Sequence, residues 1–392
     1  MARDELFARI AEGERERERE RIAPHDQIAL LRESRLGALR VPVALGGAGA
    51  SVRELFETLI ALAQADANVA QIVRAHFAFV EQVLLVPDAA FQERWLAPVA
   101  AGEIYGNAVT EIGGQQAGDF VGLSTRIAPS GDGDGGYLID GTKYYSTGTL
   151  YSDRVWVWGV TPEGVPASAV VPVDRDGVTV EDDWDGFGQR LTGTGTTRFA
   201  GVRAAADEVL LSDPDNVPPR LPVGAFLQLW LTATVAGAVR SLRDEAVTLL
   251  RDRRRGHTHG AAALPREDPV LLQAVGQIAS DAWAIEATVL SAAEAIDRAN
   301  ADVAAGRADS GAVHAASKRA AEAKVVVDRL ALRSASLLFE AGGASATKAS
   351  AGLDRHWRNI RTLASHNPTP LKAYALGDFV VNGATLPDNT YF

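Results

Sequence analysis

The sequence has 392 residues, 47% of them hydrophobic and 23% charged, which predicts a globular protein with at least one large core. Its net charge of -11 argues against a nucleic-acid-binding surface. Because cysteine is absent, disulfides, thiolate catalysis and iron–sulfur sites are excluded, in agreement with a cytoplasmic setting. We find neither the apolar segment of a signal peptide nor a run long enough to span a membrane, so no membrane partner is expected.

Residues 1–102 are expected to form an N-terminal helical bundle. Residues 13–20 alternate glutamate with arginine after a glycine, which is typical of a solvated helix with opposite charges three and four residues apart. Apolar positions then recur at helical spacing from Leu55 to Leu85, after a glycine-rich loop at residues 46–49.

The pattern of apolar and turn residues changes twice after this first segment. Residues 103–222 contain short β-like runs, such as 137–147 and 154–160, separated by turn residues, which predicts a middle antiparallel β-barrel or sandwich. Residues 223–392 return to helical periodicity and should form a C-terminal four-helix bundle followed by a tail. The expected fold class is therefore α+β with several lobes, in the order helices, strands, helices.

Several common ligand motifs are absent. The glycines after Gly193 lack the third glycine of a dinucleotide fingerprint, and no phosphate-binding P-loop occurs. The loop from Asp132 has the wrong residues at later positions for calcium, so a turn is the better interpretation. His257 and His259 have no acidic or cysteine partner nearby, and we predict no metal site.

Three segments of the middle region, in order, resemble the flavin loops of acyl-CoA dehydrogenases. They are residues 107–119, with Asn-Ala-Val-Thr-Glu, residues 141–159, with Gly-Thr-Lys-Tyr-Tyr-Ser-Thr, and residues 187–210. Two further segments, Leu-Phe-Glu-Ala-Gly-Gly at 338–343 and Arg-His-Trp-Arg-Asn at 355–359, are similar to C-terminal motifs of that family. The resemblance covers nearly the whole chain and implies that family's fold.

The resemblance also implies which residues hold the flavin ring. The polar contacts would come from Thr110, Ser146 and Thr147, and the walls from Tyr145 and Trp184. Taken singly, each hydroxyl residue is more typical of an ordinary strand or turn, so the assignment depends on the joint pattern.

A second group of residues is expected at the cofactor phosphate. Arg253, Arg254 and Arg255 end a predicted helix where the family has a phosphate-binding arginine, and we select Arg253 and Arg255. Cations that complement the helix dipole are an equally good explanation. By the resemblance, the turn at Gly342 and Gly343 approaches the cofactor of a neighbouring subunit, which implies a homotetramer or at least a dimer.

The catalytic base of an acyl-CoA dehydrogenase is missing at both positions where the family carries it. Eight residues after Asn359 stands Asn367 in place of a glutamate, and the stretch 225–237 contains no acid. The run Ser-His-Asn-Pro at 365–368 resembles instead the dibenzothiophene monooxygenase branch. That branch consists of two-component enzymes that take reduced FMN or FAD from a separate reductase.

This resemblance implies a cytoplasmic flavin-dependent monooxygenase. A flavin C4a-hydroperoxide would transfer one oxygen to a sulfur, nitrogen or electron-rich aromatic carbon of a small molecule. We expect His366 to be the acid/base, with Asn107 and Thr147 orienting the peroxide. His76 is a second candidate, although a histidine on an apolar helix face is often a core residue. An FAD-dependent acyl-CoA dehydrogenase-type oxidoreductase and a silent binding homologue are the alternatives.

Overall fold

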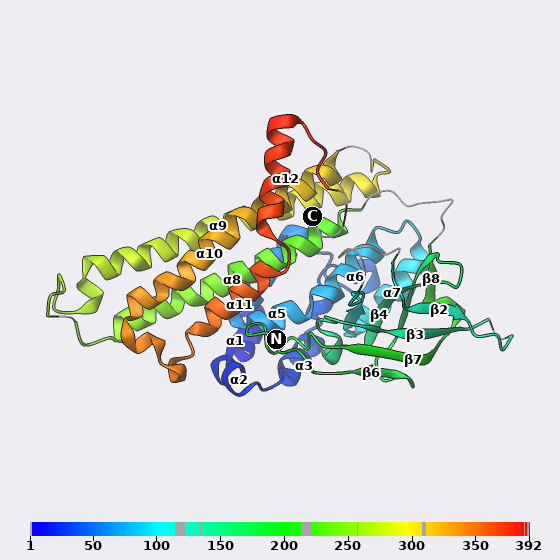
Figure 1. Ribbon diagram of the computed structural model, residues 1–392, viewed down its shortest axis with the longest axis horizontal. Coiled ribbons are helices and arrows are strands. Elements are labelled where there is room, and N and C mark those ends of the chain that lie inside the picture. The colour runs from blue at the N-terminus through cyan, green and yellow to red at the C-terminus, as the bar shows by residue number, and fades with distance from the viewer. Residues whose placement is uncertain are drawn as a thin grey trace.

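The computed structural model describes residues 2–113, 122–133, 135–212, 221–256, 258–307, 311–387, 389 and 392. Part of the first predicted flavin loop (114–119) and His257 therefore lie outside the described residues. The predicted order of helices, strands and helices is confirmed: the long C-terminal bundle lies on one side and the β-sheet on the other, and the N-terminal helices lie between them and against the sheet (Figure 1).

The N-terminal region consists of short and medium helices around a buried apolar core. Helix α4 begins with a capping box, in which the Ser51 hydroxyl accepts from the Glu54 backbone and the Glu54 carboxylate accepts from the Ser51 backbone. Asp66 caps the next helix by accepting from two backbone amides. The helices are α1 (Arg3–Ala11), α2 (Glu14–Glu20), α3 (His25–Glu33), α4 (Val52–Ala65), α5 (Ala67–Ile72), α6 (Arg74–Leu84) and α7 (Ala89–Ala101).

The middle region is a mixed sheet with strand order β6-β7-β3-β2-β4-β5-β8, to which β1 is added beside β4. Both β1 and β2 pair with β4 in parallel, so the prediction of a purely antiparallel domain is wrong for these strands. Parallel partners come from separated segments, and local turn signals do not reveal them. The strands are β1 (Tyr105–Ala108), β2 (Arg126–Pro129), β3 (Tyr137–Lys143), β4 (Arg154–Val160), β5 (Pro166–Pro172), β6 (Val178–Val180), β7 (Thr197–Ala204) and β8 (Val209–Leu211).

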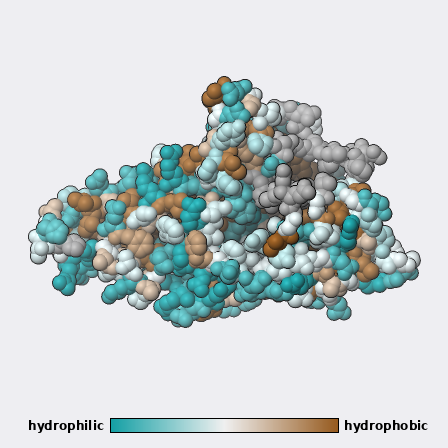
Figure 2. Space-filling view, viewed as in Figure 1, coloured by the Kyte–Doolittle hydropathy of each residue, from teal (hydrophilic) through white to brown (hydrophobic). Residues whose placement is uncertain are grey.

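The C-terminal bundle is built around α8, which packs against α4, α9, α10 and α11. Helix α8 is long and apolar enough to cross a membrane, but 78% of its most apolar window is buried inside the fold, as in a core helix. Helix α12 projects from the bundle (Figure 1) and exposes apolar side chains near its tip (Figure 2). The helices are α8 (Val223–Asp252), α9 (Pro269–Ala304), α10 (Ala312–Gly342), α11 (Asp354–Ser365) and α12 (Thr369–Asn382).

One apolar core joins the N-terminal helices to the C-terminal bundle. Trp230 of α8 stacks on Phe77 of α6 with ring centroids 5.2 Å apart. Phe56 of α4 makes edge contacts with Phe226 at 5.4 Å and with Trp230 at 6.0 Å. Large buried aromatics contribute much of the apolar area removed from water, so these helical regions are expected to unfold together.

Helix α2 is not the freely solvated helix that its alternating charges predict. Arg17 and Glu18 are only 7% and 1% exposed. Arg17 donates to the Asp66 carboxylate at 2.9 Å, and Glu18 accepts from the Asn68 side chain at 3.1 Å. The partners lie about fifty residues away in the sequence, so a local charge pattern does not reveal this burial.

His76, the second catalytic candidate, is a core histidine. Its side chain is fully buried, its Nε2 lies 2.9 Å from the Gly37 carbonyl, and its Nδ1 accepts from the Tyr105 backbone amide at 3.2 Å. The ring therefore links the residues before α4 to strand β1. Desolvation lowers the pKa of His76 to about 4, although the Gly37 hydrogen bond raises it.

The protein should become less stable as the pH falls from 6.5 to about 4. The pKa of His76 is lower in the folded than in the unfolded state, so its contribution is complete above pH 6.5 and is lost as the pH falls toward the folded pKa. The loss attributable to His76 amounts to roughly 3 kcal/mol. Urea unfolding across this range should be markedly less pH-dependent for His76→Gln. Equal pH dependence in both proteins would contradict this assignment.

Candidate flavin site

A buried ion pair joins the first two flavin loops. The Lys143 ammonium, at the end of β3, lies 2.6 Å from Glu111 Oε1 and donates to the Val109 carbonyl at 3.1 Å. Glu111 also accepts from the backbone and hydroxyl groups of Ser124 and Thr125. Burial raises the pKa of Glu111, but these hydrogen bonds outweigh burial and hold it well below its usual range.

This pair brings Thr110 beside the second loop, where the Tyr144 amide donates to the Thr110 carbonyl at 2.8 Å. Glu111 and Lys143 lie within the sequence motifs, but the motifs alone assign neither of them a role. No local signal marks Lys143, because its strand also contains Asp140 and Thr142. The full burial of its ammonium, which requires a carboxylate partner, is evident from the fold.

The backbone of the second loop is held tightly after β3. Tyr145 has a φ of +57°, a conformation that costs free energy for a residue with a side chain. Gly148 has no room for a side chain, since a Cβ atom would lie 2.2 Å from the Ile72 carbonyl oxygen. The loop therefore presses against the end of α5, and the strained Tyr145 ring is turned outward, 53% exposed.

The polar and aromatic groups of this loop fit a flavin ring. Ser146 is 1% exposed, and its hydroxyl has no hydrogen-bond partner among the residues that the structure describes. A buried hydroxyl of this kind is available to a ligand. The rings of Tyr145 and Trp184 lie 6.2 Å apart at 84°, which supplies two apolar walls at right angles. Thr147 Oγ1 contacts Thr194 Oγ1 at 2.9 Å.

Asn107 lies beside this loop. Its backbone exchanges two hydrogen bonds with the Thr149 hydroxyl, at 3.1 and 2.8 Å. The Asn107 Oδ1 atom is buried and has no partner within the described part of the chain. The structure thus brings Asn107 and the predicted ring contacts of the second loop into one region.

His366 directly follows α11 and approaches this region from the C-terminal bundle. The next residue, Asn367, is buried and donates to the side chain of Gln228, in the first turns of α8. Arg74 of α6 donates to the Leu227 carbonyl at 3.2 Å and is close enough to affect His366. Because Arg74 follows Ile72, which packs on Gly148, the start of α6 lies between the flavin loop and His366.

Basic residues face His366, although one of them, Lys324, is paired with Asp328 at 2.8 Å. Its imidazole reaches solvent, yet enough protein surrounds it that desolvation is the largest cause of its lowered pKa. Arg74, Lys324 and Lys372 lower the pKa further, and a hydrogen bond with Asn367 opposes them. These causes together favour the neutral form of the His366 imidazole in the ligand-free chain.

The predicted phosphate residues form a separate cluster. Arg253 donates to the Arg255 and Ala341 carbonyls and lies against the Gly342–Gly343 turn, where a Cβ atom on Gly343 would be 3.1 Å from the guanidinium. A cavity of about 940 Å³ opens beside Arg253 and Gly342.

His366 and the Arg253 cluster lie toward opposite ends of α8. Asn367, next to His366, contacts Gln228, and the helix reaches Arg253 25 residues later, about 37 Å along its axis. That distance exceeds the length of an FMN molecule, so a single FMN would not reach both His366 and Arg253 of one chain.

Comparison with known proteins agrees with this architecture. Residues 1–103 match the acyl-CoA dehydrogenase N-terminal domain, and residues 229–369 match the acyl-CoA dehydrogenase C-terminal domain. Dibenzothiophene monooxygenase of Mycolicibacterium goodii is 29% identical over 90% of this chain and 86% of its own length. A probable FMNH2-dependent monooxygenase, SfnC, of Pseudomonas putida is also 29% identical, over 96% of this chain and 93% of its own.

Solved structures give the same result. FMN-bound TdsC from Paenibacillus sp. A11-2 superposes with a TM-score of 0.89 at 29% identity, covering 100% of this chain and 98% of TdsC. TdsC has also been solved with FMN and indole. The chain therefore belongs to the acyl-CoA dehydrogenase family and, within it, is similar to dibenzothiophene monooxygenase and TdsC.

Proposed function

We propose that the protein uses reduced FMN, supplied by a separate flavin reductase, to transfer one oxygen atom of O2 to a small molecule. The accepting atom is a sulfur, a nitrogen or an electron-rich aromatic carbon. The relatives named for FMNH2, FMN, dibenzothiophene and indole support this assignment and favour FMN over FAD. The absence of cysteine agrees with a cytoplasmic setting.

One observation favours oxygen transfer over dehydrogenation. Removal of a substrate α-proton requires a base, and the family's dehydrogenases use a carboxylate. Here the two positions are occupied by Asn367 and by the acid-free first turns of α8, and the Asn367 amide is bonded to Gln228. The neutral His366 and its surrounding cations stand in their place.

Residues of this chain can stabilise a negative charge that develops during oxygen transfer. Bound reduced FMN supplies two electrons to O2, so that one oxygen atom reaches the substrate and the other leaves as water. Arg74, Lys324 and Lys372 favour an anion near His366, and the approach of an anion raises the pKa of the imidazole so that it can hold and deliver a proton. The free Oδ1 of Asn107 is a candidate acceptor nearby.

We propose that the flavin site is shared between two chains. Tyr145, Trp184, Ser146 and Thr110 would hold the ring in one chain. Arg253, Arg255 and the Gly342–Gly343 turn of another chain would hold the phosphate. The separation of the two clusters along α8 supports this arrangement, as do exposed apolar side chains on the bundle that would suit contact with another copy: Trp283, Leu371, Tyr374, Val380 and Val381.

His366→Ala should reduce product formation about 100-fold, because it removes the proposed proton carrier without touching the ring walls. The measurement uses the protein, FMN, a flavin reductase and either dibenzothiophene or indole, with FMN binding followed separately by fluorescence. His314→Ala, a histidine of α10 outside the site, is the matched control. Full product yield from His366→Ala would remove His366 from the mechanism.

Mixing two inactive variants should restore activity if each site is shared between chains. In a mixed pair of Arg253→Gln and His366→Ala chains, one site carries both changes and the other carries neither. Random pairing then restores about one quarter of the wild-type sites. Co-expression of differently tagged chains and assay of the mixture measures this. No gain over the separate variants would show that the two clusters do not serve one site.

A further inference from the structure

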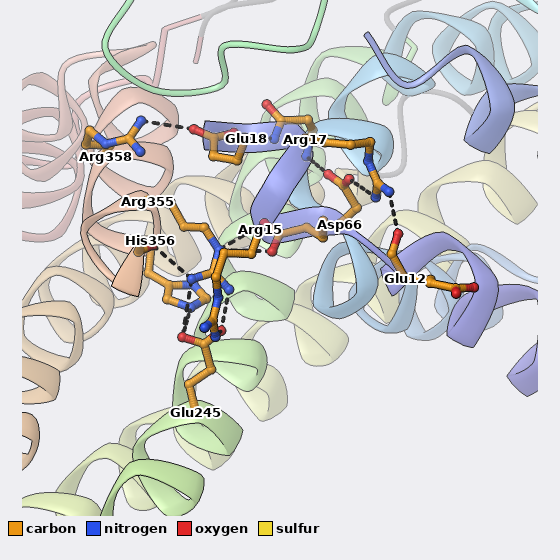
Figure 3. A network of polar contacts seen from close by, with 12 residues as sticks. Glu12, Arg15, Arg17, Glu18, Asp66, Glu245, Arg355, His356 and Arg358 are labelled. Carbon is orange, nitrogen blue, oxygen red and sulfur yellow. Dashed lines mark hydrogen bonds and ion pairs between the residues drawn. The ribbon is translucent and has the colours of Figure 1, made fainter. Parts of the chain in front are cut away.

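The charged helix α2 contacts the helix that carries His366. Figure 3 shows the Glu18 carboxylate of α2 pointing toward Arg358 of α11. Glu18 Oε1 lies 2.9 Å from Arg358 Nη1, and Glu14 lies 2.9 Å from Arg355 Nε. On its other side α2 is anchored to the start of α5, where Arg17 pairs with Asp66.

These contacts are too deeply buried to be ordinary surface ion pairs. Glu18 and Arg355 are 1% and 3% exposed. Burial raises the pKa of Glu18, and the Arg358 guanidinium lowers it, so the two groups depend on each other. The Arg358 side chain is 20% exposed and also pairs with Asp354 at 2.8 Å, so it keeps one carboxylate partner when Glu18 is changed. Removing Arg358, in contrast, leaves the buried Glu18 carboxylate without its cation.

Arg358 also connects α2 to the loop that carries the Trp184 wall. Its Nη1 donates to the Phe187 carbonyl at 2.8 Å, and the neighbouring Asn359 accepts from the Gln189 amide at 2.6 Å. Arg21, just after α2, donates to the Trp184 carbonyl. The segment 184–190 is thus held at three points by α2 and α11.

A chain of hydroxyl contacts links the same loop to Thr147. Gln189 has a φ of +52°, and its carbonyl accepts from the Thr192 hydroxyl at 2.9 Å. Thr192 Oγ1 contacts Thr194 Oγ1 at 2.6 Å, and Thr194 contacts Thr147. A shift of α11 would therefore displace the residues joined by these hydroxyl contacts. It would also displace His366, which lies eight residues after Arg358, about 12 Å along the helix.

We propose that Glu18 and Arg358 are positioning residues for oxygen transfer. The pair fixes α11 so that His366 and the Trp184–Arg190 loop keep their relative places around the flavin. It thereby determines how much of the consumed O2 reaches the substrate. The remainder takes both electrons of reduced FMN and two protons and leaves as hydrogen peroxide. This inference rests on the proposed function.

The test compares Glu18→Gln, Arg358→Gln, Arg358→Lys and the double variant Glu18→Gln/Arg358→Gln in the full-length protein. We expect product formed per O2 consumed to fall roughly tenfold in Glu18→Gln and Arg358→Gln. Arg358→Lys, which keeps the charge, should retain most of the coupling. The double variant should be no worse than either single change, because the two residues act as one unit.

Amide hydrogen exchange provides a readout that does not depend on turnover. In Glu18→Gln, exchange should increase in residues 184–194 and 354–366 and stay unchanged in α9. The matched control is Glu16→Gln, which removes an exposed carboxylate of the same helix whose contact among the described residues is Arg19, at 4.0 Å. It should leave both coupling and exchange unchanged.

Three outcomes would overturn the inference: unchanged coupling in both single variants, increased exchange throughout the protein including α9, or an equal effect of Glu16→Gln. If the wild-type protein forms no oxygenated product from either probe, the proposed function fails. The exchange pattern still decides whether Glu18 and Arg358 position the two segments, so the two failures are distinguishable.

Discussion

Burial of the α11 arginines is the constraint on which the site depends. Arg355 is shared by Glu14 of α2 and Glu245 of α8, while Arg358 is held by Glu18. Burial and the nearby carboxylates of Asp66 and Glu18 raise the pKa of Glu14 to about 7, although Arg355 lowers it. The pKa of Glu245, which also contacts His356, stays well below its usual range. A buried charge keeps its place only when its partners are fixed, so these pairs tie the first helices, the bundle and the flavin loops into one unit.

The catalytic region is assembled where three differently built parts meet. The sheet supplies Asn107 and the loop from Tyr145, the short helices α5 and α6 supply Ile72 and Arg74, and the bundle supplies His366. The sheet sets backbone positions, while the bundle brings positive charge. Helix α8 runs from this region to the Arg253 cluster, and this separation is why we propose that another chain supplies the phosphate end of the site.

The features that the sequence predicts are those with local signals. Periodicity located the helices and the β region, while linear motifs marked the candidate flavin loops and His366, whose roles stay predictions. It missed features that depend on partners distant in sequence. Glu18 meets Arg358 across 340 residues, and β1 pairs in parallel with β4, so α2 was interpreted as solvated and the sheet as antiparallel. Core packing of His76 and the separation of Arg253 from the ring residues likewise required the fold.

The central claim is that the protein transfers oxygen from O2 through bound reduced flavin. The most direct measurement is a single turnover in which protein loaded with reduced FMN is mixed with ¹⁸O₂ and either dibenzothiophene or indole. The account predicts one ¹⁸O atom per product molecule, identified by mass. It would be contradicted by product oxygen that comes from water, or by oxidised flavin that an acyl-CoA thioester bleaches without oxygen.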